Sequence, residues 1–193
     1  MRKIVFAFVS VFSLAFIQTS FAQSKSSKGP TTPMQVGSTF LNIGVGPGGD
    51  YKGHGYGTPF GVKAAVEFGL WQAGPGVVTL GGELGGNVVN SSNYYGNNHS
   101  VSSGNFIIAA RAAWHYGWDV PGLDTYGGVS AGVGFNHYTY YNNNDDEVTT
   151  TDPFPYFGVF AGASYFISPT FGFNAEFGYD ITVFQVGVVF KLQ

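Results

Sequence analysis

The sequence predicts an all-β fold, an eight-stranded antiparallel up-and-down transmembrane β-barrel that follows an N-terminal signal peptide. In its strand-like segments, charged residues occupy one side of a two-residue alternation and aliphatic or aromatic residues the other, as expected for a wall between two solvents. Charged residues form 10% of the chain, against about 25% in soluble domains, yet no later stretch is apolar enough for a helical span. Short and long connections also alternate along the chain, as in barrels of bacterial outer membranes.

The N-terminus has the pattern of a secretory signal peptide. Basic residues at positions 2 and 3 precede an apolar run, 4–17, which is shorter than the roughly 20 residues of a membrane-spanning helix. The small-x-small triplet Ser20-Phe21-Ala22 predicts cleavage before Gln23. We therefore expect a signal peptide over 1–22, a flexible periplasmic leader over 23–35, and the barrel over 36–193.

Composition excludes several classes of function. The chain has no cysteine, so disulfides, thiolate chemistry and cysteine zinc sites are excluded. Loss of the two basic residues with the signal peptide would change the formal net charge from -3 to about -5, and no basic patch remains for nucleic acid. The 30 glycines, 12 tyrosines and 19 phenylalanines suit strands, tight turns and aromatic side chains at a membrane interface.

The first four strands are predicted from alternation within each segment. Residues 39–45 set Thr, Leu, Ile and Val against Phe, Asn and Gly, and residues 60–70 set six apolar side chains against Lys63 and Glu67. A short Gly-Pro-Gly turn leads to 78–88, which carries Glu83 on its polar side. The fourth segment, 105–118, sets Phe, Ile, Ala, Trp and Tyr against Arg111 and His115.

The last four strands follow in the same way. A Pro-Gly turn at 119–124 precedes 126–136, whose apolar positions oppose Ser130 and Asn136. The sixth segment, 157–165, ends at Ser168-Pro169-Thr170, and the seventh, 171–177, carries Glu176 opposite three phenylalanines. The eighth, 182–192, carries Lys191 on its polar side. Connections after strands two, four and six are short, and the long ones, 46–59, 89–103 and 138–153, are expected to be extracellular loops. The last connection, near Tyr179, is short and departs from this rule.

Period two alone does not say whether the apolar face meets lipid or a soluble core, and a secreted sandwich or lipocalin-like barrel is the alternative. Glycine favours the membrane barrel, because it lines the charged face, where a soluble protein would place Lys, Glu and Thr, and an eight-stranded lumen is narrow. Buried charges are tolerated when they are paired. We therefore predict a charge network in the lumen. Its members are Lys63, Glu67, Glu83, Arg111, Glu176 and Lys191, and we expect Lys63, Glu83 and Arg111 to form a row.

Aromatic residues cluster at the strand ends in two groups, as expected for belts at the two membrane interfaces. Those near the short turns are Trp71, Trp114, Tyr116 and Trp118, and those near the long loops are Phe135, Tyr138, Tyr140, Tyr141, Phe154 and Tyr156.

The closing segments, Asn174-Ala-Glu-Phe-Gly-Tyr179 and Val186-Gly-Val-Val-Phe-Lys-Leu192, resemble the last hairpin of small bacterial outer-membrane barrels. The family is the porin-like "outer membrane protein β-barrel domain" family common in Bacteroidetes. The resemblance implies a monomeric barrel in the outer membrane, in contact with its lipid and lipopolysaccharide and with the barrel-insertion machinery during assembly. Such barrels usually finish on an aromatic residue, and this chain departs from that pattern by ending Phe190-Lys191-Leu192-Gln193.

No catalytic, cofactor-binding or metal-ligating residue is predicted. The histidines His54, His99, His115 and His137 lack ligands at useful spacing, and Arg111 beside His115 would disfavour its imidazolium form. The run His137-Tyr138-Thr139 is similar to the His/Ser arrangement of lipid A deacylases, but threonine replaces the serine and tyrosine the following asparagine. The acidic residues 145–147 and 152 fit a solvated loop better than a cation site, and the glycine run 44–49 lacks the Lys-Ser/Thr of a phosphate loop.

Two classes of function therefore fit the sequence best, and a third fits it less well. The first is a non-enzymatic barrel with a structural or surface-interaction role through its extracellular loops, whose partner is unknown. The second is a narrow porin-like channel for small solutes, which eight strands rarely permit. The third is a lipid-modifying membrane enzyme.

Overall fold

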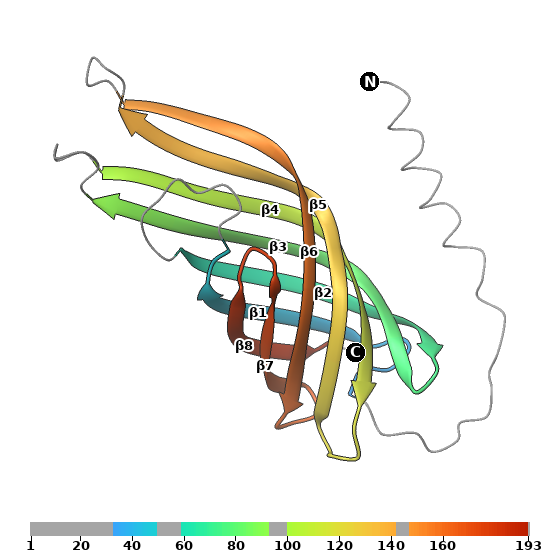
Figure 1. The fold of residues 1–193 in the computed structure, drawn as a ribbon. Helices are drawn as coiled ribbons and strands as arrows, with labels where there is room; N and C mark the ends of the chain where they lie inside the picture. Colours follow the sequence, from blue (N-terminus) through green and yellow to red (C-terminus); the bar gives the residue numbers. More distant parts are fainter. Residues whose placement is uncertain (1–32, 50–58, 93–99, 142–146, 193) are drawn as a thin grey trace, which may run out of the picture.

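Eight antiparallel strands form a closed barrel in the computed structural model, which describes residues 33–49, 59–92, 100–141 and 147–192 (Figure 1). Each strand pairs with its neighbours in sequence, and β1 closes the ring against β8. The predicted eight-stranded antiparallel up-and-down barrel is confirmed. The strands are β1 (Thr39–Pro47), β2 (Phe60–Ala73), β3 (Gly76–Ser92), β4 (Ser100–Gly117), β5 (Leu123–Tyr141), β6 (Glu147–Phe166), β7 (Phe171–Tyr179) and β8 (Phe184–Lys191).

The two faces of the wall have opposite chemistry. Large apolar side chains such as Phe157 and Phe177 point outward and are 67% and 63% exposed. Charged side chains such as Glu67 and Arg111 point into the lumen and are almost wholly buried. A protein in water would bury the first kind and expose the second, so this wall is built to be surrounded by lipid. The chain is a transmembrane β-barrel.

The described residues include no helix long and apolar enough to cross a bilayer.

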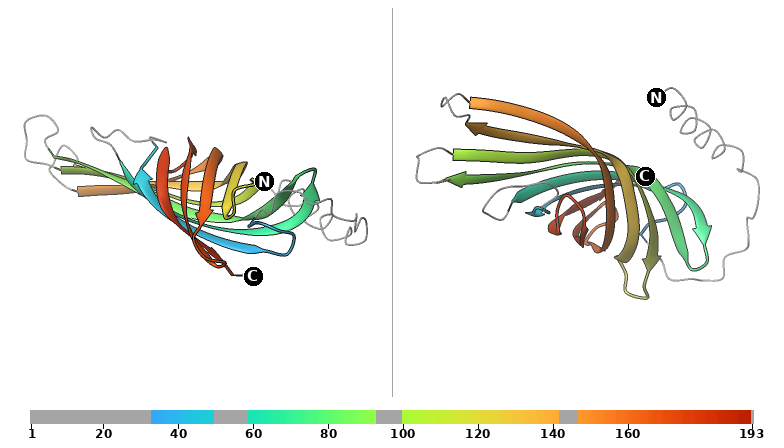
Figure 2. Two further views of the ribbon diagram at one scale, coloured as in Figure 1. Left: turned by 90° about the horizontal axis from the view of Figure 1, so that it is seen from below. Right: turned by 45° about the horizontal axis from the view of Figure 1, so that its top comes forward.

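The four middle strands are the longest, and β2, with 14 residues, is intermediate. β3 to β6 contain 17, 18, 19 and 20 residues, whereas β1, β7 and β8 contain 9, 9 and 8. In Figures 1 and 2 the long strands run past the barrel as a four-stranded sheet, hereafter the protruding sheet, on the side of the long connections. We call this side the tip end, and the side of the short connections near residues 74–75, 118–122 and 167–170 the turn end.

The protruding sheet corrects the prediction of two long loops. The expected loops 89–103 and 138–153 consist mostly of β-strand residues. β3 continues to Ser92 and β4 starts at Ser100, while β5 reaches Tyr141 and β6 starts at Glu147. Both faces of a sheet outside the membrane meet water, so the apolar alternation that marks a strand is absent there. The remaining expected loop lies mainly outside the described residues, although β1 extends to Pro47.

Along the protruding sheet, one side of β6 has no neighbouring strand among the described residues. β7 pairs with β6 only from Val159 to Phe166, whereas β5 pairs with β6 from Glu147 to Tyr165. The N–H of Phe166 donates to the carbonyl oxygen of Gly122 on the β5 side. The backbone N–H and C=O groups of even-numbered β6 residues therefore point towards β5, and those of odd-numbered residues point towards the free edge. Pro153 and Pro155 are odd-numbered and have no N–H to offer, which suits an edge position.

The aromatic residues at the turn end agree with the prediction, but two at the tip end do not. Trp71, Trp114 and Trp118 are 40–49% exposed, and the indole N–H of Trp114 donates to Ala73 O at 3.0 Å. Phe154 and Tyr156 were expected in the second belt, yet both point into the lumen and are 6% and 0% exposed. Like the buried Phe160, they are even-numbered residues of β6, whose side chains point into the lumen. The sequence prediction began the sixth strand at Phe157 and therefore did not assign these two residues to a face of the strand.

Candidate functional site

A buried ionic cluster fills the middle of the lumen, and Arg111 on β4 is at its centre. The guanidinium donates to Glu83 of β3 at 3.1 Å through Nη1 and to Glu176 of β7 at 2.6 Å through Nη2, and its Nε contacts Glu67 of β2. The side chains of all four residues are at most 3% exposed. The flat face of the guanidinium lies over Phe160, with Cζ 3.5 Å from the ring centroid. Arg111 therefore ties opposite walls of the barrel together.

Lys63 on β2 is the second cation of this cluster. Its Nζ lies 2.5 Å from Glu176 Oε1 and 4.0 Å from Glu83 Oε2, and it contacts Asp180 after β7. The Lys63 side chain is 1% exposed and three carboxylates surround its amine. The charge of the amine is therefore balanced by protein groups and not by water.

His115 on β4 joins the cluster at its turn-end side. Its Nδ1 lies 2.7 Å from Asp124 Oδ2 and its Nε2 lies 2.7 Å from Glu67 Oε2. Only an imidazole that carries a proton on both nitrogens can donate to both carboxylates. The expectation that Arg111 would disfavour the imidazolium overlooked these two acidic neighbours.

Five of the six residues predicted for the charge network meet in this cluster. The exception is Lys191, which lies at the turn end of β8 and donates through Nζ to Pro33 O at 2.9 Å. The row Lys63, Glu83, Arg111 meets through side chains although the backbone register is offset by two residues, since Lys63 faces Gly85 and Arg111 faces Gly81. Sequence reasoning did not include four further ionisable members among the described residues: His115, Asp124, Tyr156 and Asp180.

The connection between β7 and β8 folds into the tip end of the lumen. Asp180, Ile181 and Thr182, which we call the inward turn, are at most 2% exposed. The Asp180 carboxylate contacts both Lys63 and the Tyr156 hydroxyl. The Ile181 carbonyl accepts from Asn87 Nδ2 at 3.1 Å and from Gly49 N at 2.9 Å. This is why the last connection is short: it is an internal cap.

Glycines provide the room for the inward turn. A Cβ on Gly85 would lie 2.7 Å from Ile181 Cγ2, and a Cβ on Gly61 would lie 2.7 Å from Thr182 Cγ2. The glycine run 44–49, which lacks the Lys-Ser/Thr of a phosphate loop, covers the end of β1 and the two residues after it, and its Gly48 forms a bridge with Thr182. These positions hold the cap against the wall.

A methionine closes the turn end of the lumen. Met34 is 0% exposed and packs with Phe40, Val77, Phe166 and Val189. The backbone that carries it is fixed, since Gly37 N donates to Gly69 O at 2.8 Å and Gly69 N donates to Ser38 O at 2.9 Å. Residues 33–35, the end of the expected flexible leader, thus belong to the packed barrel, while the rest of that leader and the expected signal peptide lie outside the described residues.

The remaining candidates for chemistry do not assemble. Among the described residues no three His, Asp or Glu side chains are grouped as a metal site requires. His137 contacts Thr151 through Nδ1 at 2.9 Å, and Thr139 contacts Thr149 at 3.2 Å, so His137 is paired with a hydroxyl on β6 and not with Thr139. Asp152 is exposed on β6. His54, His99, Asp145 and Asp146 lie outside the described residues.

Replacing Tyr156 with phenylalanine is expected to loosen the inward turn. The variant removes the hydroxyl that donates to Asp180 and lies 3.1 Å from Glu83 Oε1, which should lower the free energy of unfolding by about 1–3 kcal/mol. Hydrogen–deuterium exchange at the Ile181 amide should become faster. Tyr165→Phe on the outward face of β6 is the control, and equal exchange at Ile181 in the two variants would contradict the assigned role.

Comparisons with known proteins concern the fold. No protein-family model matches the sequence, and no curated protein matches it. Among solved structures, the chain is similar to Ail, the attachment invasion locus protein of Yersinia pestis, in complex with the heparin analogue sucrose octasulfate, with 13% identity and a TM-score of 0.47. A second structure of Ail gives 12% identity and a TM-score of 0.40, and each match covers 80% of this chain and 93% of Ail.

Proposed function

We propose that this chain is a non-enzymatic outer-membrane barrel that acts by surface interaction through its protruding sheet. The observation that carries the proposal is the contrast between the two ends of β3 to β6. Inside the barrel their charged lumenal side chains are paired with one another or with those of other strands, whereas beyond it the four strands form a sheet whose β6 edge pairs with no described strand. A barrel needs no such extension to span a bilayer, since about 9–11 residues per strand suffice.

The surroundings of the barrel follow from its wall. Outer-membrane lipid and lipopolysaccharide would contact the outward apolar face, and the barrel-insertion machinery would act during assembly. Export by a cleaved signal peptide would leave both chain ends and the turn end in the periplasm and the tip end outside the cell. A monomer is sufficient, because the ring is closed. Membership of the Bacteroidetes-type porin-like family is part of the proposal and is supported by the closing hairpin.

The described part of the protruding sheet is rich in polar groups. Its outward face carries His137, Thr139, Thr149 and Thr151, which follow directly after the apolar Phe135 and Pro153 along β5 and β6. This change marks the level at which the wall leaves the lipid. At the free edge the backbone N–H groups of Thr149 and Thr151 lie beyond the two prolines, so an extended segment of a partner could pair there.

Trimming the protruding sheet is expected to abolish surface interaction without unfolding the barrel. Asn-Gly turns would replace residues 90–102 and 139–149, because Val89 faces Ser103 and Tyr138 faces Thr150 in the register. Cells that produce the wild type, the trimmed variant or neither would be compared for self-aggregation and for retention on a surface coated with extracellular-matrix protein. Heat-modifiable migration in the outer-membrane fraction would show that both variants are folded and correctly located. Equal behaviour of folded trimmed and wild-type protein would contradict the proposal.

A passive channel is weakened by the filled lumen. Met34 lies at one end, the ionic cluster in the middle and the inward turn at the other end, and eight strands leave little more than the space that side chains fill. We expect no single-channel steps when the purified protein is inserted into planar bilayers at physiological salt. Reproducible unitary currents from the wild type would restore the channel. No contact of the described residues favours the lipid-modifying enzyme.

A further inference from the structure

Lys191 differs from the other described basic side chains. Lys63 and Arg111 each contact several carboxylates, whereas Lys191 contacts no carboxylate among the described residues. Its side chain donates a hydrogen bond to Pro33 O, and because an ammonium group has three donors, two are left without a partner among the described residues. The residue is half-buried, and a partly desolvated charge without a counter-charge is unfavourable unless an anion joins it.

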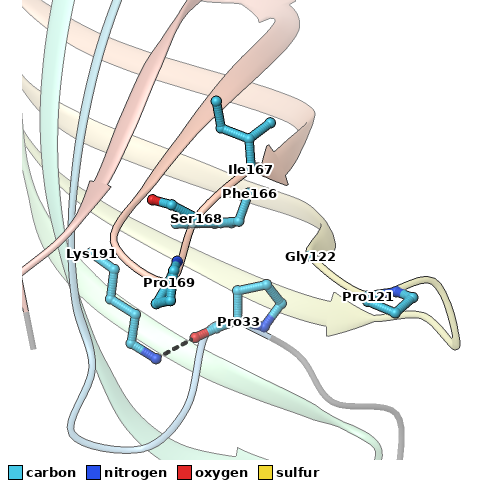
Figure 3. A pocket seen from close by; sticks show the side chains of 8 residues that line it. All are labelled: Pro33, Pro121, Gly122, Phe166, Ile167, Ser168, Pro169 and Lys191. Atoms are coloured by element: carbon cyan, nitrogen blue, oxygen red, sulfur yellow. Dashed lines mark hydrogen bonds between the residues drawn. The ribbon is translucent and has the colours of Figure 1, made fainter.

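The side chain lies at a pocket of about 400 Å³ at the turn end, within the range of small-ligand sites (Figure 3). The pocket is formed by the start of the described chain, the β4–β5 turn, the β6–β7 turn and the end of β8. None of its lining residues is acidic: they are Pro33, Pro121, Gly122, Phe166, Ile167, Ser168, Pro169 and Lys191. Lys191 is therefore the only charged residue among the described residues that line it.

Local hydrogen bonds fix the geometry of this pocket. Lys191 N donates to Thr170 O at 2.9 Å, which holds the end of β8 against the β6–β7 turn. Phe166 N donates to Gly122 O at 2.8 Å, which joins the β4–β5 turn to β6. Ser168 Oγ accepts from Phe171 N at 3.0 Å, so the hydroxyl proton of Ser168 remains available as a second donor.

The pocket lies where the barrel meets the membrane surface. Pro121 follows Trp118 by three positions, and Trp118 belongs to the exposed aromatic group of the turn end. Proline, isoleucine and phenylalanine provide apolar walls beside the amine and the hydroxyl. An anionic oxygen group attached to carbon chains would satisfy both parts.

We propose that this pocket binds a phosphate group, with Lys191 as its cationic ligand and Ser168 as a neutral donor. Phosphate fits because its oxygens accept hydrogen bonds from ammonium and hydroxyl donors alike and its charge neutralises the amine. Two sources have this chemistry, the headgroup of a phospholipid in the adjacent leaflet and free inorganic phosphate. The site goes beyond the proposed surface interaction, since it lies at the opposite end of the barrel and does not depend on the protruding sheet.

The test uses the mature chain folded in alkyl maltoside micelles, which contain no phosphate. Dihexanoylphosphatidylglycerol and inorganic phosphate are titrated separately, and the amide NMR shifts of Gly122, Ser168 and Lys191 are followed. We expect saturable shifts at these three positions with at least one probe. Saturation with the lipid alone identifies the headgroup as the source, and saturation with both identifies phosphate as such.

Variants make the result specific to Lys191. Lys191→Gln should weaken binding by about tenfold, the loss of one charge-assisted hydrogen bond, whereas Lys191→Arg should retain most of it. Lys52→Gln, which removes the same charge from the β1–β2 connection, should leave the affinity unchanged. Ser168→Ala should weaken binding by a smaller factor. It replaces Lys191→Gln as the test variant if Lys191→Gln loses its heat-modifiable migration and is therefore not folded. Absence of saturable shifts in the wild type, or equal affinities of wild type and Lys191→Gln, would overturn the site.

Discussion

Replacing Arg111 with methionine is expected to lower the free energy of unfolding by about 3–5 kcal/mol, the cost of breaking a buried ion pair. Methionine matches much of the length of arginine but carries no charge. The carboxylates of Glu67, Glu83 and Glu176 would lose their shared cation, and these side chains are at most 3% exposed, so water cannot replace it. Urea titration of the barrel in phospholipid vesicles, followed by tryptophan fluorescence and by heat-modifiable migration, measures the effect.

Two controls separate charge from volume. Ala110→Met adds the same side chain at the neighbouring position, which faces lipid, and should change the free energy of unfolding by less than about 0.5 kcal/mol. Adding Glu67→Gln and Glu176→Gln to Arg111→Met removes two of the carboxylate charges that have lost Arg111 and should recover part of the loss. A loss below about 1 kcal/mol in Arg111→Met alone would mean that the cluster does not depend on its central cation.

The sequence is sufficient to predict the faces of the wall and most of the ionic cluster, because both follow from local alternation. Successive side chains in a strand point to opposite faces, so Lys63, Glu67, Glu83, Arg111 and Glu176 were placed on the lumenal side without knowledge of the fold. A narrow lumen then requires charges of opposite sign to meet. The strand number followed from the same pattern.

Contacts across the barrel and the extent of the protruding sheet could not be predicted in this way. Lys63 and Glu176 are 113 positions apart and meet because the ring closes, and Asp180 reaches them only because its turn folds inward. Beyond the membrane no face is apolar, so β5 and β6 continue through residues without alternation. One signal was available there: Pro153 and Pro155, two positions apart, are compatible with an edge strand and not with a central one.

Glycine on the lumenal face has a second cause besides the narrow lumen. At several of these positions the backbone of the neighbouring strand comes so close that a Cβ has no space. A Cβ on Gly81 would lie 1.8 Å from Val66 O and 2.9 Å from Glu67 Cα, and both are backbone atoms that cannot move without separating β2 from β3. Glycine here allows the close approach of adjacent strands in a strongly coiled sheet.

Gly81→Ala is therefore expected to destabilise the barrel strongly, while Gly82→Ala next to it is expected to be tolerated. A Cβ on Gly82, which points to lipid, would meet only Ala109 O at 3.5 Å, an ordinary contact. Gly81→Ala should lower the free energy of unfolding by at least about 1–3 kcal/mol, the cost of overpacking, and impair closure of the ring. Gly82→Ala should be neutral or gain about 0.4–1 kcal/mol by restricting the unfolded chain. The same urea titration compares them, and because the two positions differ only in the face they occupy, similar values would contradict the assignment of lumen and lipid on β3.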